Sequence, residues 1–198
     1  MNGRLPGLIC ALLLMGGCGN SDPSASAPPM PAPSASPAIK PVAPPPPADP
    51  STLARYDGYG DMRFGMDEAA FDKAWGGELK GAPEQDSSCF YKTPKWVKLS
   101  ADFAFMFEGG RFVRYDVGTA KESAPGGGKV GMSEAQVRAL YGERVETQPH
   151  KYVAGAKYLR VAAPEGSDVL VFETDARGKV TRWHAGMPPQ VDYVEGCG

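Results

Sequence analysis

Two stretches of the chain decide its fold: Phe64–Gly76, which reads FGMDEAAFDKAWG, and Val130–Gly142, which reads VGMSEAQVRALYG. They align without a gap, and each begins with an apolar residue, Gly and Met and ends on a Gly. Asp67 and Ser133 occupy matching positions, where a short polar side chain can accept hydrogen bonds from the free amides of a helix's first turn. A closing glycine is typical of a helix C-terminus, because it adopts the left-handed conformation without a Cβ penalty. Each stretch therefore predicts a short helix that begins just after its capping residue.

Both predicted helices have one apolar face. The residues at i, i+3 and i+4 that form it are Phe71, Ala74 and Trp75 in the first copy and Val137, Leu140 and Tyr141 in the second. This spacing places them on one side of a helix, from which they can pack against a sheet. Self-similarity of this kind indicates tandem structural repeats.

A second matched block follows each helix. Phe105–Gly118 and Leu170–Gly186 both alternate apolar and polar residues on either side of a glycine-containing turn, which predicts a β-hairpin in each. Cys89–Lys92 and Tyr158–Val161 are predicted as further strands. We expect the glycine run Gly126–Gly128 to be a flexible joint between the repeats.

These elements predict an α+β fold of two tandem repeats, each a helix plus an antiparallel sheet. Residues 51–120 form the first repeat, and residues 121–198 form the second repeat with a C-terminal tail. Two arrangements remain open: the sheets of the two repeats join into one concave sheet, or they stay separate.

The glycine–methionine helix start, the hairpin after it and the tandem arrangement resemble the fold of the bacterial beta-lactamase inhibitor protein and of the small outer-membrane assembly lipoproteins of the SmpA/OmlA type. The resemblance covers about Gly60 to Gly186. In the inhibitor family, two such repeats join their sheets into a concave surface that grips a protein loop. The single-repeat lipoproteins are accessory parts of the machinery that inserts outer-membrane proteins. No contact motif of the inhibitor has a match here, so the resemblance assigns no inhibitory residue.

The composition argues against several classes of protein. Among the 198 residues, Lys+Arg 21 stand against Asp+Glu 23, and a formal net charge of -2 lacks the basic excess of a nucleic-acid-binding protein. With two histidines and four cysteines, we expect no metal and no cofactor. The run Gly126–Lys129 lacks phosphate-loop spacing, and no G-x-S-x-G nucleophile elbow is present. The sequence therefore favours a binding protein over an enzyme.

The N-terminal region predicts export and anchoring. An apolar run from Leu5 to Met15 is too short to span a membrane and is typical of a signal peptide, here residues 1–17. Two small residues before Cys18 resemble the bacterial lipobox, which implies that Cys18 is lipidated; an ordinary cleaved signal is the alternative. Gly19 in the next position implies outer-membrane sorting, with the protein facing the periplasm. Residues 18–50 then form a stalk rich in Pro, Ala and Ser, which cannot bury a core and favours extended polyproline II.

Two cysteines remain in the folded part, Cys89 and Cys197. An isolated pair in an oxidising periplasm is expected to form a disulfide, which would tie the C-terminal tail to the first repeat. A redox-active or nucleophilic thiol is the alternative, but neither cysteine belongs to a CxxC motif.

We expect the two matched hairpins to contribute the residues of a binding face. Its predicted residues are Met106, Arg114, Tyr115, Val171, Arg182, Trp183 and His184. Trp, Tyr and Arg are the side chains most enriched in binding hot spots, which favours a binding face at the aromatic and basic positions of these hairpins. For Tyr115 and Trp183, burial in the core is an equally weighted alternative.

The sequence thus predicts a non-enzymatic lipoprotein that binds another protein, most concretely as an inhibitor or immunity factor for a secreted hydrolase. Two other functions stay open: an envelope assembly or scaffold factor, and a lectin-like binder of carbohydrate or peptidoglycan that stacks sugars on Trp183 and Tyr115. The expected partners are a protein and, through the lipid anchor, the outer membrane, with no nucleic acid.

Overall fold

The computed structural model describes residues 53–198. The predicted signal peptide, the lipidation site Cys18 and the stalk over residues 18–50 lie outside the described residues. In the part that is described, neither helix has the length and apolar character needed to cross a membrane.

Both helices lie where the matched stretches predict them. Helix α1 spans Glu68–Trp75, and the carboxylate of Asp67 accepts a hydrogen bond from Ala70 N at 2.8 Å. Helix α2 spans Glu134–Tyr141 and begins with a capping box between Ser133 and Gln136. The caps satisfy amide groups that have no partner within the helix.

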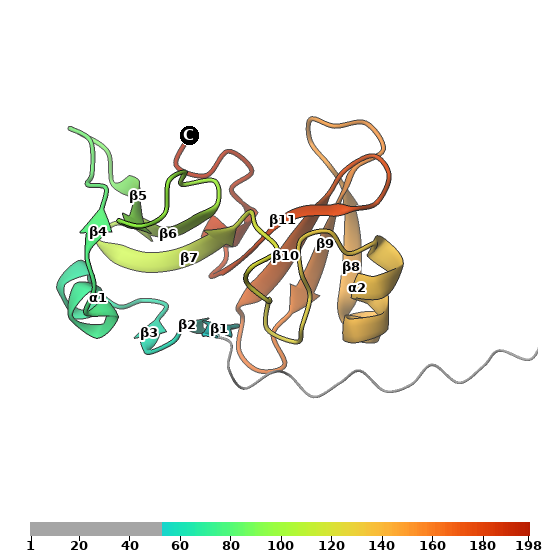
Figure 1. Cartoon of the computed structure of the whole chain (residues 1–198), viewed down its shortest axis with the longest axis horizontal. Helices are drawn as coiled ribbons and strands as arrows, with labels where there is room; N and C mark the ends of the chain where they lie inside the picture. Colours follow the sequence, from blue (N-terminus) through green and yellow to red (C-terminus); the bar gives the residue numbers. More distant parts are fainter. Residues whose placement is uncertain (1–52) are drawn as a thin grey trace, which may run out of the picture. The chain divides into compact units, whose positions relative to one another are not determined.

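The strands form two antiparallel sheets (Figure 1). The small sheet contains β1 (Ala54–Arg55), β2 (Gly58–Tyr59) and β3 (Met62–Arg63). The large sheet has eight strands in the order β4-β5-β6-β7-β11-β10-β9-β8. Their bounds are β4 Leu79–Lys80, β5 Cys89–Pro94, β6 Phe103–Glu108, β7 Arg111–Val117, β8 Val145–Pro149, β9 Lys157–Ala162, β10 Val169–Thr174 and β11 Val180–Gly186. Two short 3-10 helices, η1 (Gly142–Arg144) and η2 (Gln190–Asp192), complete the elements.

The two halves of the chain join into one sheet. In the first half, α1 is followed by β4 to β7, and in the second half α2 is followed by β8 to β11. The last strands of the halves, β7 and β11, pair antiparallel with Val117 opposite Trp183 and Arg114 opposite Gly186. The α+β fold class is confirmed, and of the two open arrangements the structure has the joined sheet. The small sheet β1–β3 was not predicted.

Both helices pack against the same face of the large sheet, and their buried residues form one apolar cluster with it. The ring of Phe71 on α1 lies edge-to-face against Phe105, Phe107 and Phe112, with centroids 4.8–4.9 Å apart. On α2, the ring of Tyr141 packs against Phe172 at 5.4 Å. We call this side of the sheet the helix face and the opposite side the tail face.

The expectation of a flexible joint at Gly126–Gly128 is wrong. Gly128 N donates to the hydroxyl of Tyr141, and that hydroxyl donates to Pro125 O at 2.8 Å. A Cβ on Gly128 would lie 2.3 Å from the ring of Phe172, so only glycine allows this close packing. The segment Gly126–Gly128 therefore packs closely against Tyr141 of α2 and Phe172 of β10.

Candidate binding site

Tyr115 and Trp183 lie in the core and not on a binding face. Both side chains are fully buried on the helix face, where their rings meet edge-to-face with centroids 5.6 Å apart. The hydroxyl of Tyr115 donates to Arg55 O at 2.8 Å. Successive side chains of a strand point to opposite faces, so neither residue can share a face with its neighbour Arg114 or His184. The structure thus corrects this part of the predicted face in favour of the core alternative.

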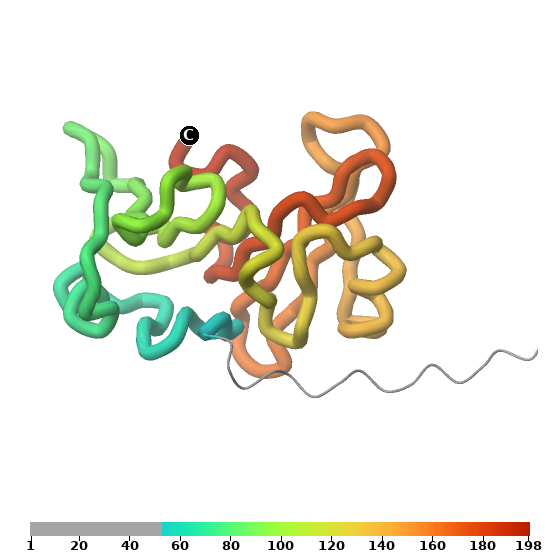
Figure 2. The backbone as a smooth tube through the Cα atoms, viewed as in Figure 1, coloured from blue at the N-terminus to red at the C-terminus, as the bar shows by residue number. Residues whose placement is uncertain are grey.

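The C-terminal tail, residues 187–197, lies across the tail face. The predicted disulfide between Cys89 and Cys197 is present, with a Cα–Cα distance of 5.3 Å. Figure 2 shows the red C-terminal segment running from the end of β11 back to the green strands of the first half. Arg114 Nη1 donates to Tyr193 O at 2.8 Å, and the His184 ring contacts Val191 O at 2.9 Å.

The remaining predicted residues do share the tail face, but mostly beneath the tail. Met106, Arg114, Val171 and His184 are each at most 4% exposed. The side chain of Arg182 is 38% exposed. The structure therefore brings these residues together and covers most of them with the chain's own tail.

A buried ion pair lies under the tail. Arg114 Nε lies 3.1 Å from both carboxylate oxygens of Asp116, and each residue is 2% exposed. Burial by itself would raise the pKa of Asp116, but the adjacent Arg114 outweighs it and holds that pKa below its ordinary value. Arg182 Nη2 adds a contact of 3.2 Å to the same carboxylate. Asp116 therefore stays ionised between two guanidinium groups.

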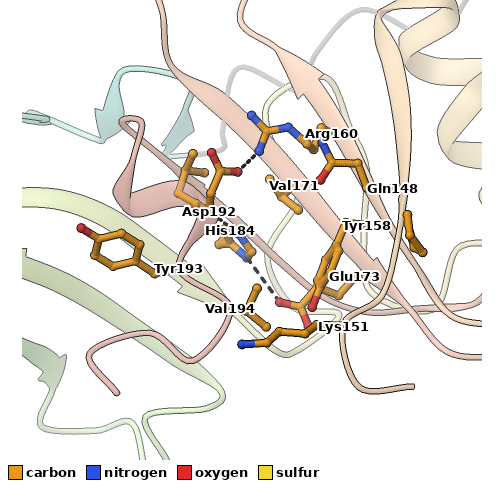
Figure 3. A pocket seen from close by; sticks show the side chains of 12 residues that line it. Gln148, Lys151, Tyr158, Arg160, Val171, Glu173, His184, Asp192, Tyr193 and Val194 are labelled. Carbon is orange, nitrogen blue, oxygen red and sulfur yellow. Dashed lines mark hydrogen bonds and ion pairs between the residues drawn. The ribbon is translucent and has the colours of Figure 1, made fainter. Parts of the chain in front are cut away.

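A pocket of about 440 Å³ opens beside the tail (Figure 3). Its lining comes from β8, β9, β10 and β11 on one side and from the tail on the other. Its lining residues include Lys151, Tyr158, Arg160, Val171, Glu173, His184, Val191, Asp192 and Val194. A second pocket of about 240 Å³ includes Arg182, and Val194 borders both. Because Arg182 Nε lies 3.6 Å from Glu173, the two pockets are neighbours along the tail.

His184 is a neutral acceptor at the floor of the first pocket. Since Val191 O can only accept, the Nε2 atom of His184 carries the hydrogen in that 2.9 Å contact. Burial, with a further contribution from the positive charge of Arg114, lowers the pKa of His184 to about 3. Its Nδ1 atom is therefore unprotonated, and it has no hydrogen-bond partner among the described residues.

Glu173 faces His184 across a gap. Its Oε1 lies 3.6 Å from His184 Nδ1, and its Oε2 lies 3.7 Å from His150 Nε2. Burial raises the pKa of Glu173. All its cationic or imidazole neighbours in the described part of the chain are too distant for a hydrogen bond.

The neutral His184 predicts an acid-sensitive fold. The unfolded chain binds a proton on this side chain below pH 6.5, whereas the folded chain does so only near pH 3, so stability is lost as the pH falls between these values. We expect the loss to be about 1.4 kcal/mol for each pH unit below about 6.5. Urea unfolding of wild type and His184→Gln at pH 7 and pH 5 measures it. The side-chain amide of the variant can still donate to Val191 O. Between pH 7 and pH 5 its free energy of unfolding should fall by about 2 kcal/mol less than that of wild type. Equal losses would contradict a neutral His184 in the folded chain.

The sequence does not single out Glu173 as a site residue, nor does it predict the course of the tail. Glu173 alternates with the core residue Phe172 on β10, a pattern that places its side chain on the opposite face of the sheet. The course of the tail had no local signal, although the disulfide implied where it ends. Among residues 53–198, no group of three or more His, Cys, Asp or Glu side chains is placed to hold a metal ion.

No protein-family model matches the chain, and no curated protein matches it. One solved structure is similar at 11% identity with a TM-score of 0.44, a Bacillus anthracis str. Ames extracellular protein containing a SCP domain. The match covers 67% of this chain and 46% of that protein, so this chain spans less than half of that protein's length.

Proposed function

We propose that this protein is an outer-membrane lipoprotein, anchored through Cys18 and facing the periplasm, that binds another protein through its tail face. The most concrete form is an inhibitor or immunity factor for a secreted hydrolase, with no catalysis and no cofactor. The observation that carries the proposal is the joined eight-stranded sheet, with both helices on one face and two neighbouring pockets along the tail on the other.

Exposed apolar side chains near the pockets support a protein partner. Leu99 is 63% exposed and precedes Ser100, which lines the second pocket. Tyr152 is 58% exposed and follows Lys151, which lines the first pocket. Large apolar and aromatic side chains at the border of a polar pocket are typical of protein interfaces. The disulfide supports an oxidising compartment such as the periplasm.

The structure does not favour the carbohydrate-binding alternative, because the two aromatic side chains expected to stack on sugars are not at the surface. Tyr115 and Trp183 are 0% exposed and cannot stack on a sugar ring. The assembly-factor alternative uses the same face and is separated from the inhibitor only by the identity of the partner.

The test is capture of the partner with a matched pair of variants. The oxidised chain is immobilised through its N-terminus, and proteins retained from periplasm and culture supernatant are identified and quantified. We expect one stoichiometric partner, retained at least tenfold less, about 1.4 kcal/mol, by the double variant Leu99→Glu/Tyr152→Glu. Leu53→Glu changes a residue that is also exposed, at 52%, but lies next to the small sheet, and it should leave capture unchanged.

The identity of the partner then decides the form of the function. Inhibition of a captured hydrolase by the soluble chain supports the inhibitor proposal, and an assembly component supports the scaffold. Retention of sacculus fragments alone, or equal capture by both variants, would overturn binding of a protein by the tail face.

A further inference from the structure

In the first pocket, His184 Nδ1 and Glu173 Oε1 face each other, and neither receives a hydrogen bond from a described side chain, although Arg182 Nε lies 3.6 Å from the same oxygen. His184 Nδ1 lies 3.6 Å from Glu173 Oε1, and a dashed line marks this contact in Figure 3. His184 is 4% exposed, and its Nδ1 is an unpartnered polar atom of the described structure. A buried acceptor without a partner is costly, so this arrangement favours a ligand that supplies hydrogen-bond donors at this position.

The charge pattern around the pocket favours a cationic donor. Lys151 pairs with Glu195 at 3.2 Å, and Arg160 pairs with Asp192. The Nη2 atom of Arg182 is directed to Asp116 at 3.2 Å. Each of these bordering cations therefore has a carboxylate partner in closer contact than any cationic or imidazole nitrogen of the described residues has with Glu173. Within the described part of the chain, Glu173 is paired only with Arg182 Nε and the two imidazoles at 3.6–3.7 Å, so a further cation can approach this carboxylate more closely.

The walls of the pocket suit an alkyl stem. Val171 and Val191 belong to a small apolar cluster of the tail face, and the partly buried Tyr158 packs against it. The ring of Tyr158 stacks on His150 with centroids 4.5 Å apart, which holds the ring in place. A volume of about 440 Å³ is larger than one extended side chain needs.

We propose that this pocket receives a lysine side chain of the partner protein, whose ammonium donates to Glu173 and to His184 Nδ1 while its methylenes lie against Val171, Val191 and Tyr158. An ammonium has three donors and no acceptor, which matches two facing acceptors. A guanidinium is planar and wider than an ammonium. It binds best to a carboxylate that can accept two parallel hydrogen bonds, and a carboxylate oxygen facing an imidazole nitrogen does not offer that geometry. This inference rests on the proposed function, since it names the side chain by which the partner is recognised.

The first arm of the test uses a small probe and the mature chain with its disulfide intact. N-acetyl-lysine methylamide is titrated and followed by NMR, with the norleucine analogue as the same stem without the ammonium. We expect saturable binding of the lysine probe and at least tenfold weaker binding of the norleucine probe. The ¹⁵N resonance of His184 Nδ1 should move only with the lysine probe, because only that probe donates a hydrogen bond to it.

Two variants separate recognition from folding. Glu173→Gln should weaken the lysine probe at least tenfold, whereas Glu165→Gln, a change of an exposed acid in the β9–β10 loop, should not. Urea unfolding checks that both variants remain folded, and both should unfold cooperatively like wild type. Equal binding of both probes, no saturable binding, or a Glu173→Gln variant that binds like wild type would overturn the proposal.

The second arm distinguishes this inference from the function on which it rests. The captured partner should be displaced by the lysine probe, and its capture should fall at least tenfold with Glu173→Gln. Capture that survives both changes would overturn the lysine inference and leave protein binding intact. Binding of the lysine probe without any captured partner would contradict a protein as the source of the ammonium.

Discussion

Replacing Asp116 by Asn is expected to lower the free energy of unfolding by about 3–5 kcal/mol. The substitution keeps the shape of the side chain but leaves Arg114 as a buried cation without its counter-charge, at 2% exposure. The guanidinium would still donate to the tail carbonyls Gln190 O and Tyr193 O, which cannot neutralise it. Urea unfolding at pH 7, followed by tryptophan fluorescence, measures the loss.

Two controls show whether the buried charge is responsible. Asp57→Asn removes a carboxylate that pairs with Arg55 at half exposure, and it should change stability by no more than about 1 kcal/mol. The double variant Arg114→Met/Asp116→Leu removes both charges and should recover most of the stability lost in Asp116→Asn. An Asp116→Asn protein that unfolds like wild type would refute the role given to this ion pair.

The double variant Cys89→Ala/Cys197→Ala is expected to lose about 2–5 kcal/mol of stability. The disulfide joins residues 108 apart in sequence, so its removal restores much conformational freedom to the unfolded chain. It also frees the end of the tail from β5, and the tail then depends on contacts such as those of Arg114 and His184. Unfolding curves of the variant and of reduced wild type should agree.

Hydrogen exchange tests the local part of that prediction. The amides of Val191 and Tyr193 should exchange faster in the cysteine variant because the tail opens locally. The amides of β6 and β10 should exchange only through global unfolding, at the rate that the lowered free energy of unfolding sets. A variant with unchanged unfolding and unchanged exchange in the tail would show that the non-covalent contacts alone hold it.

Much of the fold follows from local signals. Asp67 and Ser133 begin helices because their side chains bond the first turn, an interaction that spans three residues and needs no tertiary context. Apolar and polar residues alternate in Phe105–Gly118 and Leu170–Gly186, because one face of each hairpin is buried against the helices. Both predicted hairpins are present in the structure. The disulfide followed from the number of cysteines and the expected compartment.

The remainder depends on contacts between distant residues. Strand β4 has two residues, and β8 contains Pro149, so neither has a strong strand pattern of its own. The pairing of β7 with β11 places Tyr115 next to Trp183, and this burial cannot be read from either strand alone.

The sequence predicts only part of the candidate site. It predicts one face that contains Met106, Arg114, Val171, Arg182 and His184, but not that the tail covers most of them and helps to form the pocket. Glu173 is not among the site residues that the sequence predicts. Its significance comes from the distance to His184 Nδ1, which is a property of the folded sheet.

The pairing of β7 with β11 also limits when a growing chain can finish folding. Because a polypeptide is synthesised from its amino terminus, β7 exists with a row of free backbone amides and carbonyls before β11 does. Such an unpaired edge can pair with other chains, so the half-made chain is the state most prone to aggregation. The disulfide joins Cys89 to Cys197, which follows β11 in the chain, so it can form only after β11 has been made. A chain that is interrupted before β11 therefore has neither a covered β7 edge nor this disulfide.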